Sequence, residues 1–176
     1  MYRMNKPPRW GKIDTEKLFE LATRYLEKND FGLAHTKRVF DIAKQHFSVK
    51  PDLQELTYTA IIFHDAGGST IKDQYEKGPQ IAAQILKNLS CSDNFIKQVC
   101  DIISTHHEHP SNPSEPFRVL YDSDKLVMFS QEEYPYYNAR EGFDWDKIVN
   151  LIYTKKGQEL AKKSLTQRRV EQNNTR

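Results

Sequence analysis

The residues best suited to chemistry are His64 and Asp65, which stand together at the end of the apolar run 59–63. A neighbouring imidazole and carboxylate can both ligate one divalent metal ion. Because Asp beside His is common by chance, the pair gains weight from two other segments. His35 lies upstream, and Asp122 and Asp124 lie downstream, each in an apolar helical pattern. The sequence therefore predicts that three distant segments converge on one ion.

The two aspartates of the downstream segment cannot both face the same ion. At roughly 100° per residue, Asp122 and Asp124 lie about 200° apart around a helix. Asp124 shares its face with Leu120 and Val127, so we expect Asp124 to be the ligand. Asp122 is then expected to take a supporting or substrate-side position.

Two imidazoles and two carboxylates suit borderline and harder divalent ions, namely Mn, Fe, Ni, Co, Zn or Mg. The absence of cysteine ligands argues against a structural thiolate zinc site. Such a set leaves coordination positions open for water and substrate, as hydrolysis requires, since the ion lowers the pKa of bound water and neutralises charge on a phosphoryl group. A lone histidine is more often structural, and His46 keeps that interpretation. The other five histidines fall at or near helix ends that could surround one cavity.

The elements that position these residues are helices, because the apolar period is helical and few stretches alternate. The patterns predict helices from Asp14 or Thr15 to 26, over 33–46, from Pro51 to just past the His-Asp pair, from Pro79 to 89, from Ser92 to about 107, over 117–128 and over 145–165. The stretch 67–78 is interpreted as a loop. An all-α bundle follows.

At 176 residues the chain is long enough for one domain and short for two. We expect a metal-binding core at about 30–130, C-terminal helices at 143–165 and a polar, frayed tail at 166–176. The formal charge of +2 gives no reason to expect a nucleic-acid or membrane partner. No apolar run reaches the length of a membrane span, and residues 1–10 lack the apolar stretch of a secretory signal. We expect a cytoplasmic protein with reduced Cys91 and Cys100, and a homodimer is left open.

Taken in order, His35, the pair His64-Asp65, Thr105-His106-His107 and Asp122-Ser123-Asp124 form a pattern that resembles the HD-domain metal-dependent phosphohydrolase superfamily. The resemblance covers about residues 30–130 and extends more weakly over 153–161. It implies an all-α fold in which His35, His64, Asp65 and Asp124 bind one ion in a central cleft.

The sequence also departs from better-defined branches of that superfamily. Members that bind two metals usually carry a further histidine where this chain has Gly78. We therefore expect one ion, with a second held by His106 or His107 and Asp122 only under metal excess. Gly68 stands where the five-prime nucleotidases and alarmone hydrolases carry glutamate, and the further motifs of the cyclic-di-GMP phosphodiesterases are not found. We therefore do not predict the substrate specificity of any of these branches for this chain.

Three basic residues are candidates for binding the phosphate of a substrate. Arg38 follows the first histidine by one turn, and its planar fork could hold a phosphate. A salt bridge to Asp41, or a surface position, explains Arg38 equally well. Lys125 could neutralise phosphate or simply pair with Asp122. Lys72, in the stretch rich in glycine, is a weaker candidate.

Other side chains are candidates for proton transfer and for base stacking. Asp65 could handle the proton of the attacking water, and His106 or His107 could protonate the leaving oxygen, because histidine titrates near neutral pH. The helical pattern cannot decide which of the two histidines faces inward. The tyrosines of the run 134–137 could stack on a base, but core or lid packing is the commoner role. The dipeptide at 9–10, Arg-Trp, is interpreted as an N-terminal flap.

The sequence thus predicts a mononuclear metal phosphohydrolase. It would cleave a phosphomonoester or phosphoanhydride of a small molecule, a nucleotide above all, by attack of metal-bound water. Two alternatives stay open. One is a di-iron oxygenase-like enzyme of the same superfamily, and the other is a metal or nucleotide sensor that keeps the ligands but turns nothing over.

Overall fold

Helices are the only regular secondary structure in the part of the chain that the computed structural model describes, residues 13–27 and 31–174. Within those ranges the helices are α1 (Thr15–Leu26), α2 (Gly32–His46), α3 (Gln54–Phe63), α4 (Ile71–Asn88), α5 (Asp93–Ile103), α6 (Glu115–Val127), α7 (Tyr134–Asn138), α8 (Trp145–Leu151) and α9 (Lys155–Asn174). The all-α prediction is confirmed. Arg9 and Trp10 lie outside the described residues, so the N-terminal flap stays a prediction.

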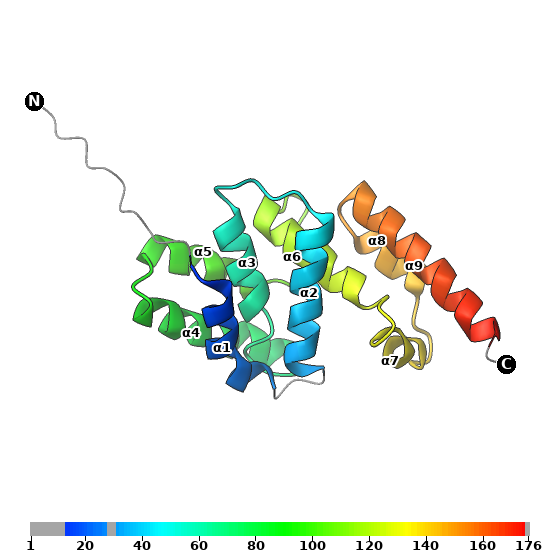
Figure 1. Ribbon diagram of the computed structural model, residues 1–176, viewed down its shortest axis with the longest axis horizontal. Coiled ribbons are helices and arrows are strands. Elements are labelled where there is room, and N and C mark those ends of the chain that lie inside the picture. Colours follow the sequence, from blue (N-terminus) through cyan, green and yellow to red (C-terminus); the bar gives the residue numbers. More distant parts are fainter. Residues whose placement is uncertain (1–12, 28–30, 175–176) are drawn as a thin grey trace, which may run out of the picture.

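Helix α3 forms the centre of the fold because its sequence is apolar on nearly every side. The stretch Thr59–Phe63 is entirely buried, as expected of a helix that is surrounded by other helices. Helices α1, α2, α5 and α6 all pack against α3, and Figure 1 shows it in the middle of this group. The two residues that directly follow α3, His64 and Asp65, therefore lie inside the molecule rather than at its surface.

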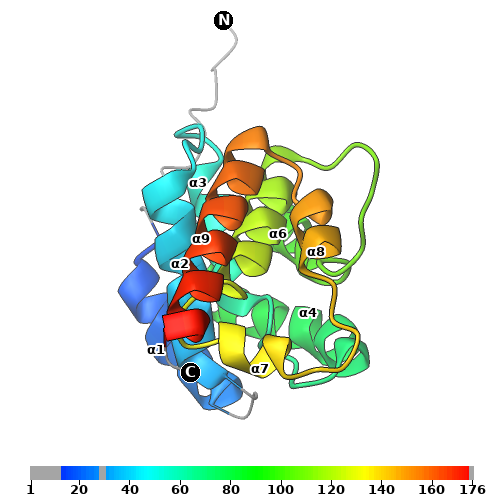
Figure 2. The same ribbon diagram turned by 90° about the vertical axis from the view of Figure 1, so that its right-hand side faces the viewer.

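Helix α6 joins this core to a second apolar cluster near the C-terminus. Helices α8 and α9 pack on one another, and α9 also packs on α6, as Figure 2 shows. The indole of Trp145 stacks on the ring of Tyr134, with centroids 4.7 Å apart. The buried Tyr134 thus anchors the short helix α7, which follows α6.

Several predicted boundaries are wrong. Helix α3 begins at Gln54 and ends at Phe63, before the His-Asp pair, α5 ends at Ile103 instead of about 107, and α7 was not predicted. Two larger differences concern α4 and the C-terminal helices. Residues 71–78 are helical rather than a loop, because the hydroxyl of Thr70 caps α4 by accepting from the backbone N–H of Asp73. Pro79 consequently lies inside α4 instead of starting it. The predicted helix 145–165 is two helices, and α9 continues to Asn174. The tail predicted to be frayed from 166 is therefore helical as far as Asn174, and its Arg, Gln and Glu residues have good helix propensity.

Ser92 caps α5 as predicted, by accepting from the backbone N–H of Phe95. Cys91 and Cys100 are both free and partly buried. Among the described residues, no helix has both the length and the apolar composition that crossing a membrane requires.

Candidate metal centre

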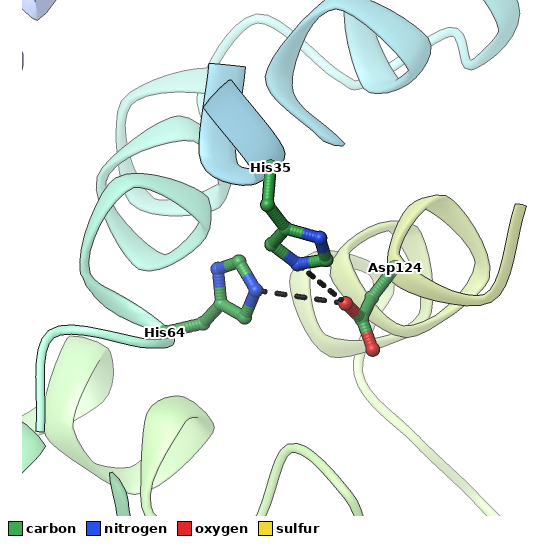
Figure 3. A group of neighbouring side chains, drawn as sticks. All are labelled: His35, His64 and Asp124. Atoms are coloured by element: carbon green, nitrogen blue, oxygen red, sulfur yellow. Dashed lines mark ion pairs between the residues drawn. The ribbon is translucent and has the colours of Figure 1, made fainter. Parts of the chain in front are cut away.

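Three side chains from separate helices meet where α2, α3 and α6 come together. His35 lies in the first turn of α2, His64 follows the last residue of α3, and Asp124 lies on α6. The Oδ1 atom of Asp124 is 3.2 Å from Nε2 of His35 and 3.6 Å from Nε2 of His64. Figure 3 shows both imidazoles directed at this carboxylate. All three side chains are buried.

Asp65 lies between this group and a second one. Its Oδ2 atom is 3.5 Å from Nε2 of both His35 and His64, and its Oδ1 atom is 3.6 Å from Nε2 of His106. His106 and His107 follow the end of α5, which packs on α3. Ligand atoms of Asp65, His106 and His107 lie within 4.8 Å of one another, as do those of the first three side chains.

The orientation of two imidazoles is fixed by backbone carbonyls. Nδ1 of His64 is 2.6 Å from the carbonyl oxygen of Ile61, and Nδ1 of His106 is 2.6 Å from that of Ile103. Because a carbonyl oxygen can only accept, each Nδ1 carries the hydrogen. In the neutral ring, Nε2 then holds a lone pair, and this is the nitrogen that faces the carboxylates.

Three buried nitrogen atoms, Nε2 of His35, His64 and His106, make no hydrogen bond. Such groups are rare in proteins and call for an explanation, for which a bound ion is one answer. A divalent cation coordinated by the nitrogens of His35 and His64 and by the carboxylates of Asp65 and Asp124 would give those two nitrogens a partner, while Nε2 of His106 stays directed at Asp65. Imidazole and carboxylate together are ligands that first-row transition metals accept. The residues present therefore fit the metal ion that the sequence predicts.

The charged groups of the cluster shift one another's pKa values. Burial lowers the pKa of His35, but Asp124, Glu133 and Asp65 outweigh it and raise that pKa to about 10. Burial opposes a charge on His64 too, and the two aspartates raise its pKa. Burial acts to raise the pKa of Asp65 and Asp124, yet neighbouring histidines hold the pKa of Asp65 below its usual range, and Lys125 with two histidines does the same for Asp124. An ion that binds the Nε2 atoms of His35 and His64 must therefore compete with protons for them.

A cavity of about 300 Å³ opens onto the cluster and is lined by His35, Asp65 and Asp124. This volume is at the small end of the range for ligand pockets. Aromatic and basic side chains also line the cavity: Phe31, Tyr136, Tyr137, Lys125 and Arg140. The guanidinium of Arg140 lies 4.4 Å from the ring centroid of Tyr136 and 5.1 Å from that of Tyr137.

The predicted phosphate-binding residues have different surroundings. Lys125 lines the cavity, and its Nζ atom is 3.3 Å from Oδ2 of Asp124, so it pairs with a candidate ligand rather than with Asp122. Arg38 is not among the lining residues, and its guanidinium donates to Glu133 instead of reaching Asp41 or an open phosphate site. Lys72 is exposed in the first turn of α4 and does not line the cavity either.

Asp122 points away from the cluster, as its helical angle predicted, but it takes no supporting place there. Its carboxylate accepts hydrogen bonds from the backbone N–H groups of Tyr153, at 2.7 Å, and Thr154, at 2.9 Å. It thereby ties the segment between α8 and α9 to α6, and burial raises its pKa. The expected substrate-side role and the expected second-ion site with Asp122 are corrected accordingly, since the second group forms around Asp65.

Both His106 and His107 reach the site, where the helical pattern could not choose between them. Nε2 of His106 faces the carboxylates, whereas His107 lines the cavity with its Nε2 atom 2.6 Å from Oε1 of Gln74. Burial and the neighbouring His106 lower the pKa of His107 to about 4, so this ring is neutral near neutral pH. His109, which was also expected near the cavity, stacks instead on Tyr153.

Sequence reasoning missed Glu133, Gln74 and Arg140. Glu133 is fully buried although it follows Glu132, which is exposed, and nothing in the local pattern separates the two. Gln74 was hidden by the interpretation of 67–78 as a loop. Arg140 lies beyond α7 and belongs to no motif. The aromatic run 134–137, which precedes Arg140, was the one feature of the sequence that could have indicated this side of the cavity.

Comparison with known families agrees with this geometry. The family model for the HD domain matches residues 32–128, which is more than half of the chain. The matched stretch runs from the start of α2 to just past α6 and contains every member of both ligand groups. No curated protein and no solved structure matches the chain. The family match, together with the His and Asp cluster, shows that the chain belongs to the HD-domain superfamily of metal-dependent phosphohydrolases.

Proposed function

We propose that the protein is a metal-dependent phosphohydrolase that cleaves a phosphomonoester or phosphoanhydride of a nucleotide. The observation that carries this proposal is the set of three buried imidazole nitrogens without hydrogen bonds, which face two carboxylates beside a cavity. A sensor of metal or nucleotide could share these features. Turnover is therefore what the experiment must measure.

We propose one ion, held by His35, His64, Asp65 and Asp124, with Mn, Fe, Ni, Co, Zn and Mg as candidates. When bound, such an ion supplies Lewis-acid chemistry, because it activates water and neutralises charge that develops on the phosphoryl group. Phosphate binding and proton transfer are then the tasks of side chains in and around the ligand set.

Lys125 is the side chain we assign to the phosphate. It is the cation that both lines the cavity and contacts a ligand, Asp124, so its charge lies where a phosphoryl oxygen would be presented. We assign proton transfer to Asp65 and His106, whose side chains face one another. His107 is neutral near neutral pH, so it suits hydrogen bonding to water or substrate better than proton donation.

The aromatic rings favour a substrate that carries a flat base. Phe31 contacts both Tyr136 and Tyr137, with ring centroids 5.0 Å and 6.1 Å apart, and all three rings line the cavity. A base could stack on such rings while the phosphate reaches Lys125. The small volume favours one nucleotide unit over a longer chain.

Phosphate release tests the proposal. The purified protein is supplied with Mn²⁺, Co²⁺, Ni²⁺, Zn²⁺ or Mg²⁺ and assayed against a generic phosphoester, a panel of nucleotides, and ribose 5-phosphate as the matched compound without a base. We expect metal-dependent turnover that is faster with nucleotides than with ribose 5-phosphate. No turnover with any ion, combined with tight nucleotide binding, would identify a sensor instead.

The second ligand group favours one other candidate, a two-metal oxygenase-like enzyme. Asp65, His106 and His107 could hold a second ion next to the first, although Gly78 removes a ligand that two-metal members usually have. Two tightly bound irons per chain, with dioxygen consumed in the presence of an organic substrate, would establish it. One ion per chain and phosphate release would contradict it.

A further inference from the structure

Glu133 is a buried carboxylate that lies outside the stretch matched by the HD domain. It precedes α7, and its side chain has no exposed surface. Burying a charged group is costly unless it is paired and hydrogen-bonded. The partners of the Glu133 carboxylate therefore indicate the role of this residue.

The carboxylate of Glu133 bridges two residues that lie one turn apart on α2. Its Oε1 and Oε2 atoms are 3.0 Å and 3.2 Å from Nδ1 of His35. Arg38 donates to Oε1 from Nη2 at 2.7 Å and from Nε at 3.2 Å. Arg38 thus balances the buried charge, and the second contact of Glu133 falls on a candidate metal ligand.

The need for Glu133 follows from the place of His35 in its helix. His64 and His106 each follow the end of a helix, where the carbonyl three residues earlier is free to accept from Nδ1. For His35, in the first turn of α2, the carbonyl three residues earlier belongs to Gly32, the first residue of the helix, and it is the normal acceptor of the backbone N–H of Thr36. Glu133 supplies the acceptor from a segment 98 residues away.

We infer that Glu133 is a positioning residue for metal binding, which holds His35 with the hydrogen on Nδ1 so that Nε2 faces the cation. This inference rests on the proposed function. A carboxylate that accepts from Nδ1 makes Nε2 a stronger electron-pair donor to a metal than a carbonyl acceptor does. The loss of such a partner typically weakens metal binding about 10- to 100-fold. Arg38 acts through Glu133 and not on the phosphate.

The test compares two isosteric changes at fully buried carboxylates, Glu133→Gln and Asp122→Asn. Asp122 is a matched control because its carboxylate also accepts hydrogen bonds from two residues, but from their backbone N–H groups, and does not touch the cluster. Mn²⁺ and Zn²⁺ affinities are measured by calorimetric titration, and folding of each variant is followed by circular dichroism. We expect Glu133→Gln to weaken both ions about 10- to 100-fold and Asp122→Asn to leave them unchanged.

The outcomes separate this inference from the proposed function. Wild-type protein that binds neither ion, and none of the other candidate ions in the same titration, overturns both. Wild-type binding that Glu133→Gln leaves intact, or that Asp122→Asn weakens equally, overturns the positioning role alone. If Glu133→Gln fails to fold, imidazole NMR of the wild-type protein with Zn²⁺ decides the matter. A hydrogen on Nδ1 of His35 supports the role, and a hydrogen on Nε2 refutes it.

Discussion

Gly67 lies in the turn that presents His64 and Asp65, and replacing it tests how tightly this turn must pack. A Cβ atom at Gly67 would lie 2.3 Å from the carbonyl oxygen of Asp73 and 2.6 Å from Cα of Gln74. Both atoms belong to the backbone of α4 and cannot swing aside. Gly78 on the same helix is a matched control, since a Cβ there would meet the nearest atom of Gly67 at an ordinary 3.6 Å.

The size of the effect follows from these contacts. Bringing the closest pair to an ordinary separation requires a shift of about 1 Å in the turn or in α4, and such overpacking costs about 1–3 kcal/mol of unfolding free energy. Metal–ligand distances tolerate only about 0.2 Å. Gly67→Ala should therefore lower both stability and metal affinity. Gly78→Ala should preserve affinity and gain up to about 1 kcal/mol, because Ala favours a helix over Gly.

Urea denaturation of the metal-free proteins gives the unfolding free energies, and calorimetric titration with Mn²⁺ gives the affinities. The reasoning is refuted if Gly67→Ala matches the wild type in both measurements. It is equally refuted if Gly78→Ala proves the more damaging change.

Three further predictions concern the ligands and the cavity. Asp65→Ala should abolish metal binding while the helices persist, because it removes the carboxylate that contacts imidazoles of both groups; metal analysis and circular dichroism check this. Near neutral pH, Mn²⁺ binding should release at least one proton, because the pKa of His35 is about 10 without the ion, and affinity should weaken as pH falls. Calorimetry in buffers of different ionisation enthalpy counts the protons, and equal enthalpies would contradict the prediction. Tyr137→Ala should raise KM for nucleotides about two- to tenfold, as loss of a stacking ring implies, and leave KM for ribose 5-phosphate unchanged.

The candidate ligands were accessible to sequence reasoning because each stands at a position with a strong local pattern. His64 and Asp65 follow an apolar run, and Asp124 shares a helical face with core residues. The rotation of roughly 100° per residue along a helix also predicted that Asp122 points away from the cluster. It could not show what Asp122 contacts, since its partners, Tyr153 and Thr154, come from a distant segment.

The start of α4 was missed because glycine and proline were weighed without their surroundings. Pro79 favours a first turn in isolation, and Gly78 disfavours a helix. In the folded protein, Thr70 caps α4 well before both. The turn approaches α4 most closely at Gly67, where a Cβ atom would meet the backbone of Asp73 and Gln74 at less than 3 Å, whereas a Cβ atom at Gly78 would fit. Gly67 therefore marks close packing of the turn on a helix rather than a loop.

Glu133 and Arg140 mark the limit of motif-based reasoning at this site. The candidate metal ligands lie within residues 32–128, whereas Glu133, Tyr136, Tyr137 and Arg140 come from the segment that follows. That segment touches His35 at one end and lines the cavity at the other. Tyr134 anchors it in the second apolar cluster, so its position depends on packing with α8 and α9 and not on the HD pattern. Changes in that cluster should therefore alter substrate choice and the support of His35 while the remaining ligands stay in place.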